Sequence, residues 1–295
     1  MRVLITGARG KVGSFAAEAF RAAGHRVVLS DIAPARYGLT GERFRYLRAD
    51  LTDYGQTIGV VMAAKPDVIV HAAGIPDSSH DPGPTIFANN SLANFHVAEA
   101  VAQTGVGRLV YLSSETALGF VTALRPFLPD YLPVDEEHAR RPQEAYALSK
   151  SLGEDICDSL VRRCDATAVS IRPSLVLAPA DYALIGGLQR ATGRSFNHWS
   201  YVDVEDLADL IVLAATTPTP GHEVVYAAQP DNLLGASFRQ LVADALGDDA
   251  PPLRDLERED CGGISIAKAR RLFGWNPTRS WRDRTNATND NGGHQ

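Results

Sequence analysis

The chain has 295 residues, of which 45% are hydrophobic and 22% are charged. This composition predicts a globular protein with a sizeable core and excludes a collagen-like, wholly disordered or disulfide-scaffold chain. The 29 Lys and Arg residues against 35 Asp and Glu give a net charge of −6. Without a basic surplus, we expect no nucleic-acid partner and no attraction to an anionic membrane, which leaves chemistry on a small-molecule substrate.

The sequence also predicts where the protein works. No apolar stretch approaches the roughly 18 residues of a membrane span, and the short apolar run after Met1 enters a glycine loop, so we expect neither a membrane segment nor a signal peptide. Cys157 and Cys164 would lie roughly 10 Å apart on one helix, too far for a disulfide. We therefore expect the three cysteines to be core residues of a protein in the reducing cytoplasm.

The first half of the chain alternates short apolar runs with longer helical patterns. We expect strands at 3–5, 27–29, 44–47, 68–70, 109–112 and 168–171. We expect helices at 12–23, 56–64, 85–103 and 144–163. This alternation predicts βαβ units and therefore an α/β fold, a doubly wound parallel sheet of the Rossmann type.

The rhythm breaks after Pro173, where the sequence becomes glycine-rich, and two Thr-Pro pairs follow near residue 218. We assign 1–172 plus 201–216 to a nucleotide-binding domain. A small C-terminal substrate lobe is expected from 173–200 plus 221–282, including a strand at 223–226. Residues 283–295 are polar without periodicity and are expected to form a disordered tail.

Glycines follow the first expected strand and open the first helix at Gly7, Gly10 and Gly13. Glycines here permit a tight turn and let the backbone approach a pyrophosphate, which the free N–H groups of the helix start can bind. The context on both sides of the loop therefore predicts a nucleotide site.

Acidic residues end the next two strands. A carboxylate at Asp31 can bind ribose hydroxyls and would repel a 2′-phosphate, which favours NAD over NADP. Arg9 and Arg36 could reach a 2′-phosphate, so NADP is not excluded. Asp50 follows the third strand, where an adenine edge would lie, but its spacing suits a helix N-cap equally well.

Tyr146 and Lys150 lie four residues apart and hence on one face of a helix. A nearby ammonium lowers the pKa of a phenol, which makes Tyr146 a plausible proton acceptor. We expect this pair to face a cleft while an apolar stripe beginning at Leu148 packs against the protein. Ser114 follows a strand end, where its hydroxyl could hold a substrate oxygen or simply cap a helix.

Together these motifs resemble the extended short-chain dehydrogenase/reductase superfamily, in its NAD-dependent epimerase/dehydratase branch. The resemblance covers most of 1–280 and is carried by an ordered set of motifs: Thr6-Gly-x-x-Gly-x-x-Gly13, Asp31, Asp50-Leu51, His71-Ala-Ala-Gly74, Ser113-Ser114, Tyr146-x-x-x-Lys150 and Arg172-Pro173.

The resemblance implies that Tyr146 is the general acid/base of hydride transfer to or from the nicotinamide, that Lys150 lowers its pKa and binds the nicotinamide ribose, and that Ser114 orients the reacting oxygen. In the resembling family the helices at 85–103 and 144–163 commonly form a dimer interface, so the resemblance allows a homodimer and leaves the oligomeric state open. The implied cofactor-binding residues are Gly7, Gly10, Lys11, Val12, Asp31, Asp50, Leu51, Ala72, Ala73, Gly74, Asn90, Tyr146, Lys150 and Pro173.

Departures from the family concern the substrate. Thr116 stands where the resembling dehydratases carry a Glu, which argues against dehydration, and the short path from Ser174 to Tyr201 leaves little chain to wrap a nucleoside diphosphate. The compact second lobe and the Gly74-Ile75-Pro76 segment look more like those of the uronate-type sugar dehydrogenases. We therefore expect a small sugar, sugar acid or polyol.

Candidate substrate contacts are Glu115, Ser174 and an arginine, Arg190 or Arg194, that could pair with a carboxylate. Glu115 could equally be an exposed loop acid, and either arginine a surface residue. An NAD-retaining epimerase, acting on a sugar or a nucleotide sugar, and a non-catalytic NAD(P)-sensing protein remain alternatives. The histidines show no ligand spacing, so we expect no metal.

Overall fold

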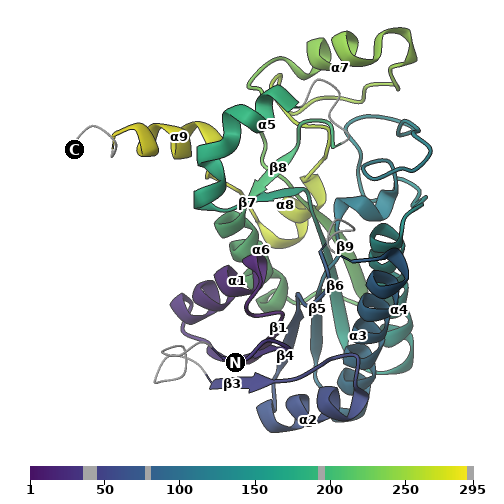
Figure 1. Cartoon of the computed structure of the whole chain (residues 1–295), viewed down its shortest axis with the longest axis vertical. Helices are drawn as coiled ribbons and strands as arrows, with labels where there is room; N and C mark the ends of the chain where they lie inside the picture. Colours follow the sequence, from purple (N-terminus) through teal and green to yellow (C-terminus); the bar gives the residue numbers. More distant parts are fainter. Residues whose placement is uncertain (36–44, 77–80, 192–196, 291–295) are drawn as a thin grey trace.

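A parallel seven-stranded sheet forms the centre of the protein (Figure 1), and the computed structural model describes residues 1–35, 45–76, 81–191 and 197–290. The strand order is β3-β2-β1-β4-β5-β6-β9. The strands are β1 (Arg2–Thr6), β2 (Arg26–Asp31), β3 (Arg45–Arg48), β4 (Val68–His71), β5 (Arg108–Leu112), β6 (Thr167–Pro173) and β9 (His222–Ala227). The reversal of order between β1 and β4 is that of a doubly wound dinucleotide-binding sheet, which confirms the predicted fold class.

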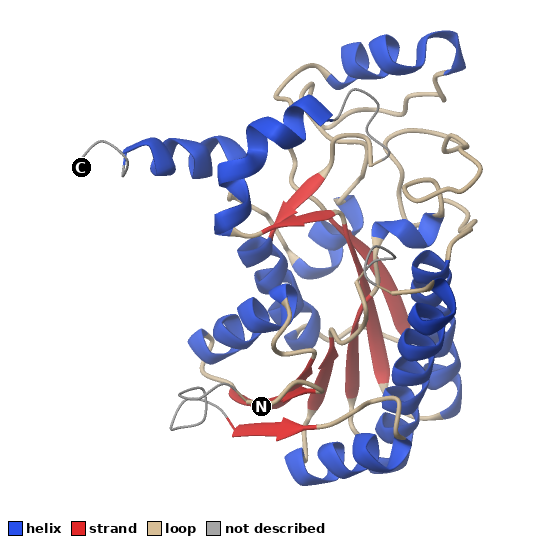
Figure 2. Ribbon diagram, viewed as in Figure 1, coloured by secondary structure: helices blue, strands red, loops and turns tan. Residues whose placement is uncertain are grey.

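Helices cover both faces of this sheet (Figure 2). One face carries α2 (Tyr54–Ala64), α3 (Gly83–Thr104) and α4 (Ala145–Arg163), and the other carries α1 (Lys11–Ala22), α6 (Val204–Thr216) and α8 (Ala267–Phe273). Side chains alternate along the strands, so that Val3 and Ile5 enter the core under α1 and α6 while Leu4 enters the core under α2 and α3. The near-continuous apolar strands of the sequence follow from this two-sided burial.

A smaller region lies beyond the carboxyl end of β6. It contains the two-stranded parallel sheet of β7 (Leu175–Leu177) and β8 (Tyr201–Asp203), together with η2 (Pro179–Leu184), α5 (Ile185–Ala191), α7 (Phe238–Leu246) and η3 (Gly247–Asp249). Across the described ranges, no helix combines the length and apolar character that a membrane crossing requires.

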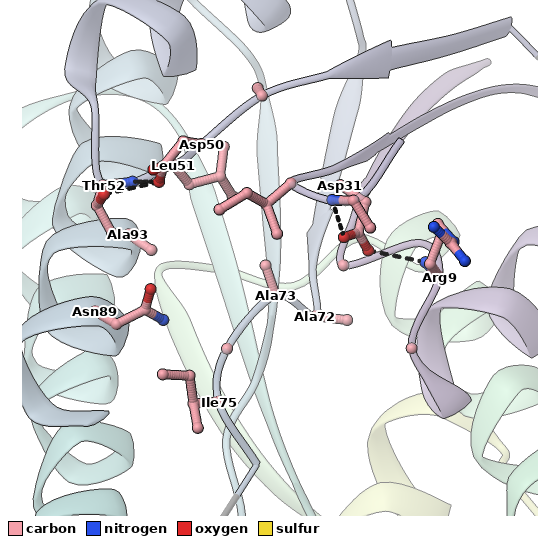
Figure 3. Close-up of a pocket in the computed structure, with 16 residues that line it drawn as sticks. Arg9, Asp31, Asp50, Leu51, Thr52, Ala72, Ala73, Ile75, Asn89 and Ala93 are labelled. Carbon is pink, nitrogen blue, oxygen red and sulfur yellow. Dashed lines mark hydrogen bonds between the residues drawn. The ribbon is translucent and has the colours of Figure 1, made fainter. Parts of the chain in front are cut away.

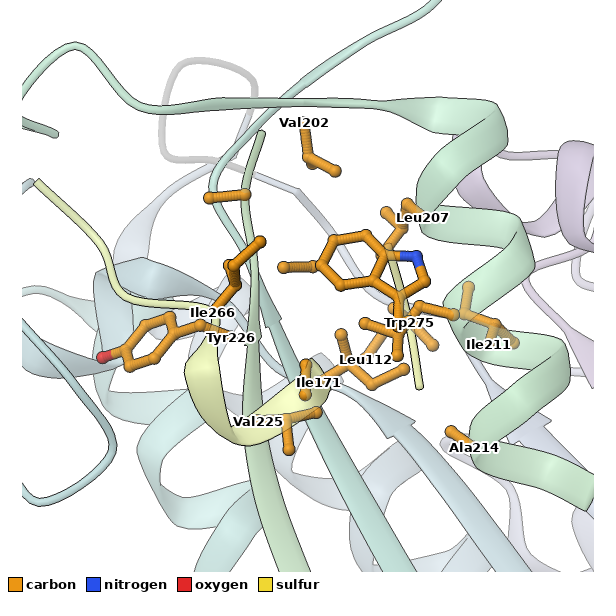
Figure 4. Close-up of a cluster of buried hydrophobic side chains, with 14 of the residues drawn as sticks. Leu112, Ile171, Val202, Leu207, Ile211, Ala214, Val225, Tyr226, Ile266 and Trp275 are labelled. Atoms are coloured by element: carbon orange, nitrogen blue, oxygen red, sulfur yellow. The ribbon is translucent and has the colours of Figure 1, made fainter. Parts of the chain in front are cut away.

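The expectation that 221–282 belong wholly to a substrate lobe is wrong. Strand β9 pairs in parallel with β6 along its whole length and completes the main sheet. Trp275, 2% exposed, inserts between α6 and the sheet beside Ile171 and Val225, and its Nε1 donates to the carbonyl oxygen of Asp206 at 2.9 Å (Figure 4). The local pattern predicted a strand correctly but could not reveal that its partner would be the open edge of β6. The remaining lobe boundaries stay predictions.

The expectation of a disordered tail from residue 283 is also wrong within the described part of the chain. Helix α9 (Trp281–Asp290) extends from the body of the protein (Figure 1). Arg284 anchors its start, because its guanidinium contacts Asp203 at 3.0 Å and Glu205 at 2.6 Å. Residues 291–295 lie outside the described residues.

Candidate active site

The glycine loop packs tightly against the end of β4. Gly7 has a φ of +66°, and a Cβ on it would lie 2.5 Å from the amide nitrogen of Ala73. Gly10 is the N-cap of α1, so no side chain occupies the first N–H groups of that helix. A free helix start behind a close backbone turn fits a bound phosphate.

A cavity of about 450 Å³ adjoins this loop (Figure 3). The predicted cofactor residues that line it are Gly7, Gly10, Asp31, Asp50, Leu51, Ala72, Ala73 and Gly74. Wall residues that the sequence did not single out include Ile32, Thr52, Asn89 and Ala93. Ile32 is 56% exposed directly after Asp31. The position of Ile32 directly after the expected ribose ligand was the available sequence signal for this wall residue.

Hydrogen bonds fix the two acidic residues of the cavity. The Asp31 carboxylate accepts from the amides of Arg9 and Ala33, both at 3.0 Å. The Asp50 carboxylate accepts from the amide and hydroxyl of Thr52 at 2.9 and 2.7 Å, whereas Asp53 is the N-cap of α2. The alternative that Asp50 caps a helix is therefore wrong.

The 2′-phosphate alternative concerns Arg9 and Arg36. The Arg9 guanidinium donates to the carbonyl oxygen of Pro34 at 2.7 Å, and Arg9 is one of the residues that line the cavity. Arg36 lies outside the described residues. Asp31 is the described residue whose carboxylate favours NAD over NADP.

Other predicted cofactor residues hold neighbouring segments together. Lys11 bridges to Asp181 at 2.7 Å and so ties the start of α1 to η2. Buried Asn90 binds the backbone of Ile75 and donates to the Ser149 hydroxyl at 3.2 Å, while its neighbour Asn89 faces the cavity. Val12 is half-buried in the first turn of α1, and Pro173 is the last residue of β6.

The structure brings Tyr146 and Lys150 together on α4. Lys150 is 6% exposed, its Nζ donates to the carbonyl oxygen of Leu112 at 2.7 Å, and Nζ lies 5.6 Å from the centroid of the Tyr146 ring. Burial lowers the pKa of Lys150 to about 8, because the charged form loses hydration. Near neutral pH the ammonium still prevails, and it can stabilise a phenolate on the half-buried Tyr146.

Ser114 caps a helix, which is one of the two roles that the sequence allowed. It is the N-cap of η1 (Glu115–Leu118), and its hydroxyl oxygen accepts from the amide and hydroxyl of Thr116 at 3.2 and 3.0 Å. These two bonds use the lone pairs of the hydroxyl, so its proton is the part left to donate. Ser114 is accordingly suited to donate to a substrate oxygen.

The predicted substrate residues fall in different surroundings. Glu115 is 5% exposed, so the alternative of an exposed loop acid is wrong, and burial raises its pKa well above the usual range. Its Oε2 has no partner among the described residues. Ser174 is buried and donates to the carbonyl oxygen of Ala227 at 3.3 Å. Arg190 is exposed on α5, and Arg194 lies outside the described residues.

The expected packing of α4 is wrong at Leu148, which is 46% exposed. The buried face of the helix instead carries Lys150, Gly153 and Glu154. A Cβ on Gly153 would lie 2.2 Å from the Tyr111 hydroxyl, so glycine permits the close approach of α4 to β5. Hydrogen-bonding partners compensate the burial of the two charged side chains, an effect that hydrophobic periodicity does not register.

His71 has a structural environment rather than a catalytic one. Its ring nitrogens contact the Thr6 hydroxyl at 2.7 Å and the Asn94 side-chain oxygen at 2.9 Å, and burial lowers its pKa to about 3. Within the described ranges, no group of three or more His, Cys, Asp or Glu side chains is arranged to hold a metal ion.

The doubly wound sheet, the glycine loop at its switch point and the acidic end of β2 together define a dinucleotide-binding protein. Residues 3–227 match the model of the NAD dependent epimerase/dehydratase family, and the chain belongs to this family. The match ends at Ala227, the last residue of β9. The predicted family, its enzymatic class within the extended short-chain dehydrogenases/reductases, and NAD as its cofactor are confirmed.

Curated relatives include a uronate dehydrogenase of Pseudomonas syringae pv. tomato, 31% identical over 227 residues that cover 76% of this chain and 73% of the relative. A UDP-glucose 4-epimerase of Mycolicibacterium smegmatis is 27% identical, with 94% of each chain covered. Among solved structures, a UDP-galactose 4-epimerase has a TM-score of 0.70 at 24% identity, with 96% of each chain covered. At that identity, the likeness shows a shared fold.

Proposed function

We propose that this protein is an NAD-dependent oxidoreductase that interconverts a carbinol and a carbonyl carbon of a small sugar, sugar acid or polyol. The observation that carries the proposal is the buried Lys150 ammonium beside the Tyr146 ring. This ammonium is bound to the carbonyl oxygen of Leu112 at the end of β5, two residues before Ser114. NAD, when bound, would supply the hydride acceptor or donor.

The cavity walls fit the cofactor. Asp31 offers a fixed carboxylate to the adenosine ribose, and Ile32 and Leu51 offer apolar surface to the adenine. The uncapped start of α1 behind Gly10 offers N–H groups to the pyrophosphate. These features support binding of the cofactor by the residues that the sequence indicated.

The proton chemistry belongs to three side chains. In the oxidation direction, the Tyr146 phenolate oxygen accepts the proton of the substrate hydroxyl, and the charge on Lys150 stabilises that phenolate. Ser114 donates to the same substrate oxygen and so favours the negative charge that develops there. In the reduction direction, Tyr146 returns the proton to the carbonyl oxygen.

The uronate dehydrogenase relatives and the short connection from Ser174 to Tyr201 favour a compact substrate. A protonated Glu115 could donate to a substrate hydroxyl. The alternative is an epimerase that retains NAD, supported by the 94% coverage of a UDP-glucose 4-epimerase. A non-catalytic NAD(P)-sensing role has less support, because it would not require Ser114, Tyr146 and Lys150 together.

The test combines a substrate panel with Tyr146→Phe. The wild-type protein should reduce NAD with a compact sugar, uronate or polyol, and Tyr146→Phe should lose at least about 100-fold in kcat while it keeps NAD affinity. Tyr54→Phe, a half-buried tyrosine at the start of α2, is the matched control with unchanged turnover. An active Tyr146→Phe refutes the assignment. NAD released only on denaturation, without net reduction, favours the epimerase.

We also propose a homodimer across α3 and α4. Leu92 and Phe95 on α3 and Leu148 on the adjacent α4 are large apolar side chains that are each close to half exposed. Burial of such side chains against a second copy is favourable at roughly 25 cal/mol per Å².

A further inference from the structure

A buried ion pair lies one helical turn beyond Lys150. Glu154 follows Lys150 by four residues on α4, so both side chains leave the same face of the helix. Its carboxylate binds the Arg172 guanidinium through two bonds, Nε to Oε1 at 2.8 Å and Nη2 to Oε2 at 2.7 Å, and both side chains are 3% exposed. The pair is therefore bidentate and dehydrated.

The same carboxylate contacts residues at the ends of two strands, and Arg172 extends the contact to a third. The Ser113 hydroxyl, next to Ser114 at the end of β5, donates to Glu154 Oε1 at 2.6 Å. Arg172, which precedes Pro173 in β6, also donates to the Tyr226 hydroxyl of β9 at 3.2 Å. Glu154 thus connects α4 to the strand ends that carry the proposed substrate and cofactor contacts.

A buried ion pair adds little net stability compared with well-packed apolar residues, because both ions lose hydration. The position of this pair points to another use. We propose that Glu154 is a positioning residue of the active site, which keeps the neighbouring Lys150 charged and holds Ser114 in place through Ser113. This inference rests on the proposed function of Tyr146 and Lys150.

Titratable groups from several elements surround Lys150. Those facing it are His71 from β4, Tyr111 from β5, and Tyr146 and Glu154 from α4 itself. Glu154 in turn contacts two arginines, Arg172 of β6 and, at 3.4 Å, the partly exposed Arg140. His71 is neutral above its low pKa, and the Tyr111 hydroxyl is neutral because burial raises its pKa. Burial pulls the pKa of Lys150 down to about 8, and the Glu154 carboxylate opposes that fall.

Removing the carboxylate would take away the negative charge that opposes the effect of burial on Lys150, whereas removing Arg172 would leave that negative charge without its bidentate partner. Without the carboxylate, the ammonium would lose its proton at a lower pH, and Tyr146 would lose the charge that stabilises its phenolate. Removing both partners would leave the net charge of the pair unchanged at zero.

The experiment uses the NMR signals of lysine labelled with ¹³C at Cε, since the chain contains four lysines: Lys11, Lys65, Lys150 and Lys268. Lys150→Met assigns the signal. We expect Glu154→Gln to move the Lys150 titration midpoint down by about one pH unit or more, and Arg172→Gln to move it up. The double variant should return it toward the wild-type value.

Asp165→Asn is the matched control, because Asp165 is an exposed acid just after the end of α4, outside the contacts of Glu154. It should leave the Lys150 midpoint unchanged. A Glu154→Gln midpoint equal to that of the wild type overturns the proposal. If Glu154→Gln does not fold, the opposite shift in Arg172→Gln and its cancellation in the double variant carry the test, and a lack of shift there overturns it.

The titration needs neither cofactor nor substrate, so a failure of the proposed reaction would not be confused with a failure of this inference. Where turnover is measured, the alkaline limb of the kcat profile should move with the Lys150 midpoint, while KM for NAD stays within about twofold of the wild-type value. A kcat loss of equal size at every pH would contradict the electrostatic role.

Discussion

The sharpest prediction concerns Gly13, where the first helix approaches the glycine loop most closely. A Cβ on Gly13 would lie 2.3 Å from the carbonyl oxygen of Gly7 and 2.9 Å from the Cα of Ala8. Ordinary contact begins near 3.4 Å, so in Gly13→Ala the loop must retreat by roughly 1 Å. The obstructing atoms are backbone, so no change of a side-chain rotamer can relieve the contact.

Two consequences follow from that displacement. Overpacking should destabilise the protein by about 1–3 kcal/mol. The affinity for NAD should fall much further, on the order of 100-fold, because the loop then presents its N–H groups about 1 Å from the positions that fit the pyrophosphate.

Gly10→Ala and Gly59→Ala provide two comparisons for the effect of Gly13→Ala on stability and NAD binding. A Cβ on Gly10 would meet the Gly7 carbonyl oxygen at 3.3 Å, so Gly10→Ala should be milder than Gly13→Ala. Gly59, exposed within α2, has no atom within 4 Å of its added Cβ, and Gly59→Ala should stabilise the protein by about 0.5–1 kcal/mol with unchanged NAD binding.

Urea unfolding measures the stability of each variant, and isothermal titration calorimetry measures NAD binding. The reasoning is refuted if Gly13→Ala binds NAD as tightly as Gly59→Ala does, because the loop geometry would then not control the cofactor site.

Three further predictions test other parts of the structure. His71 has a folded-state pKa of about 3 and an unfolded-state value near 6.5, so its contribution to stability is present above pH 6.5 and is lost as the pH falls. Between pH 6.5 and 4 the wild type should lose roughly 3 kcal/mol more than His71→Gln in urea unfolding, and parallel losses would contradict this. Asp31→Asn should weaken NAD binding about tenfold or more, because a charged acceptor for the ribose hydroxyls is lost. It should also raise the ratio of NADP to NAD affinity, because the carboxylate that repels a 2′-phosphate is gone. An unchanged ratio in calorimetry would show that Asp31 does not select the cofactor. Phe95→Glu should convert a wild-type dimer into a monomer in sedimentation analysis, and a monomeric wild type at micromolar concentration would end the dimer proposal.

The nucleotide-binding half could be predicted because its signals are local. Short apolar runs bounded by turn residues define β1 and β4, and the glycines at 7, 10 and 13 reflect backbone contacts within one loop. A motif of this kind can be recognised from the sequence alone, because the residues that contact one another are close together in the chain.

The position of Glu154 could not be predicted in the same way. Its partners Ser113 and Arg172 lie 41 and 18 residues away in the sequence, and only the packing of α4 on β5 and β6 brings them together. Leu148 gives the opposite example, because its apolar side chain predicts burial but is 46% exposed in the structure. The position of Glu154, four residues after Lys150 and on the same helix face, was a sequence signal for a contact between them. The apolar stripe beginning at Leu148 was given more weight in the prediction of the buried face.

The pairing of β9 with β6 also changes the argument about substrate size. Total length does not separate a compact substrate from a nucleotide sugar, because the chain covers 94% of a UDP-glucose 4-epimerase. With β9 in the sheet and Trp275 in the core beneath α6, the chain left to surround a substrate is smaller than the sequence implied. The η2 part of that chain is tied to the glycine loop through Lys11 and Asp181. Because this short segment, η2, is held next to the glycine loop, it leaves room for a compact substrate bound close to Tyr146.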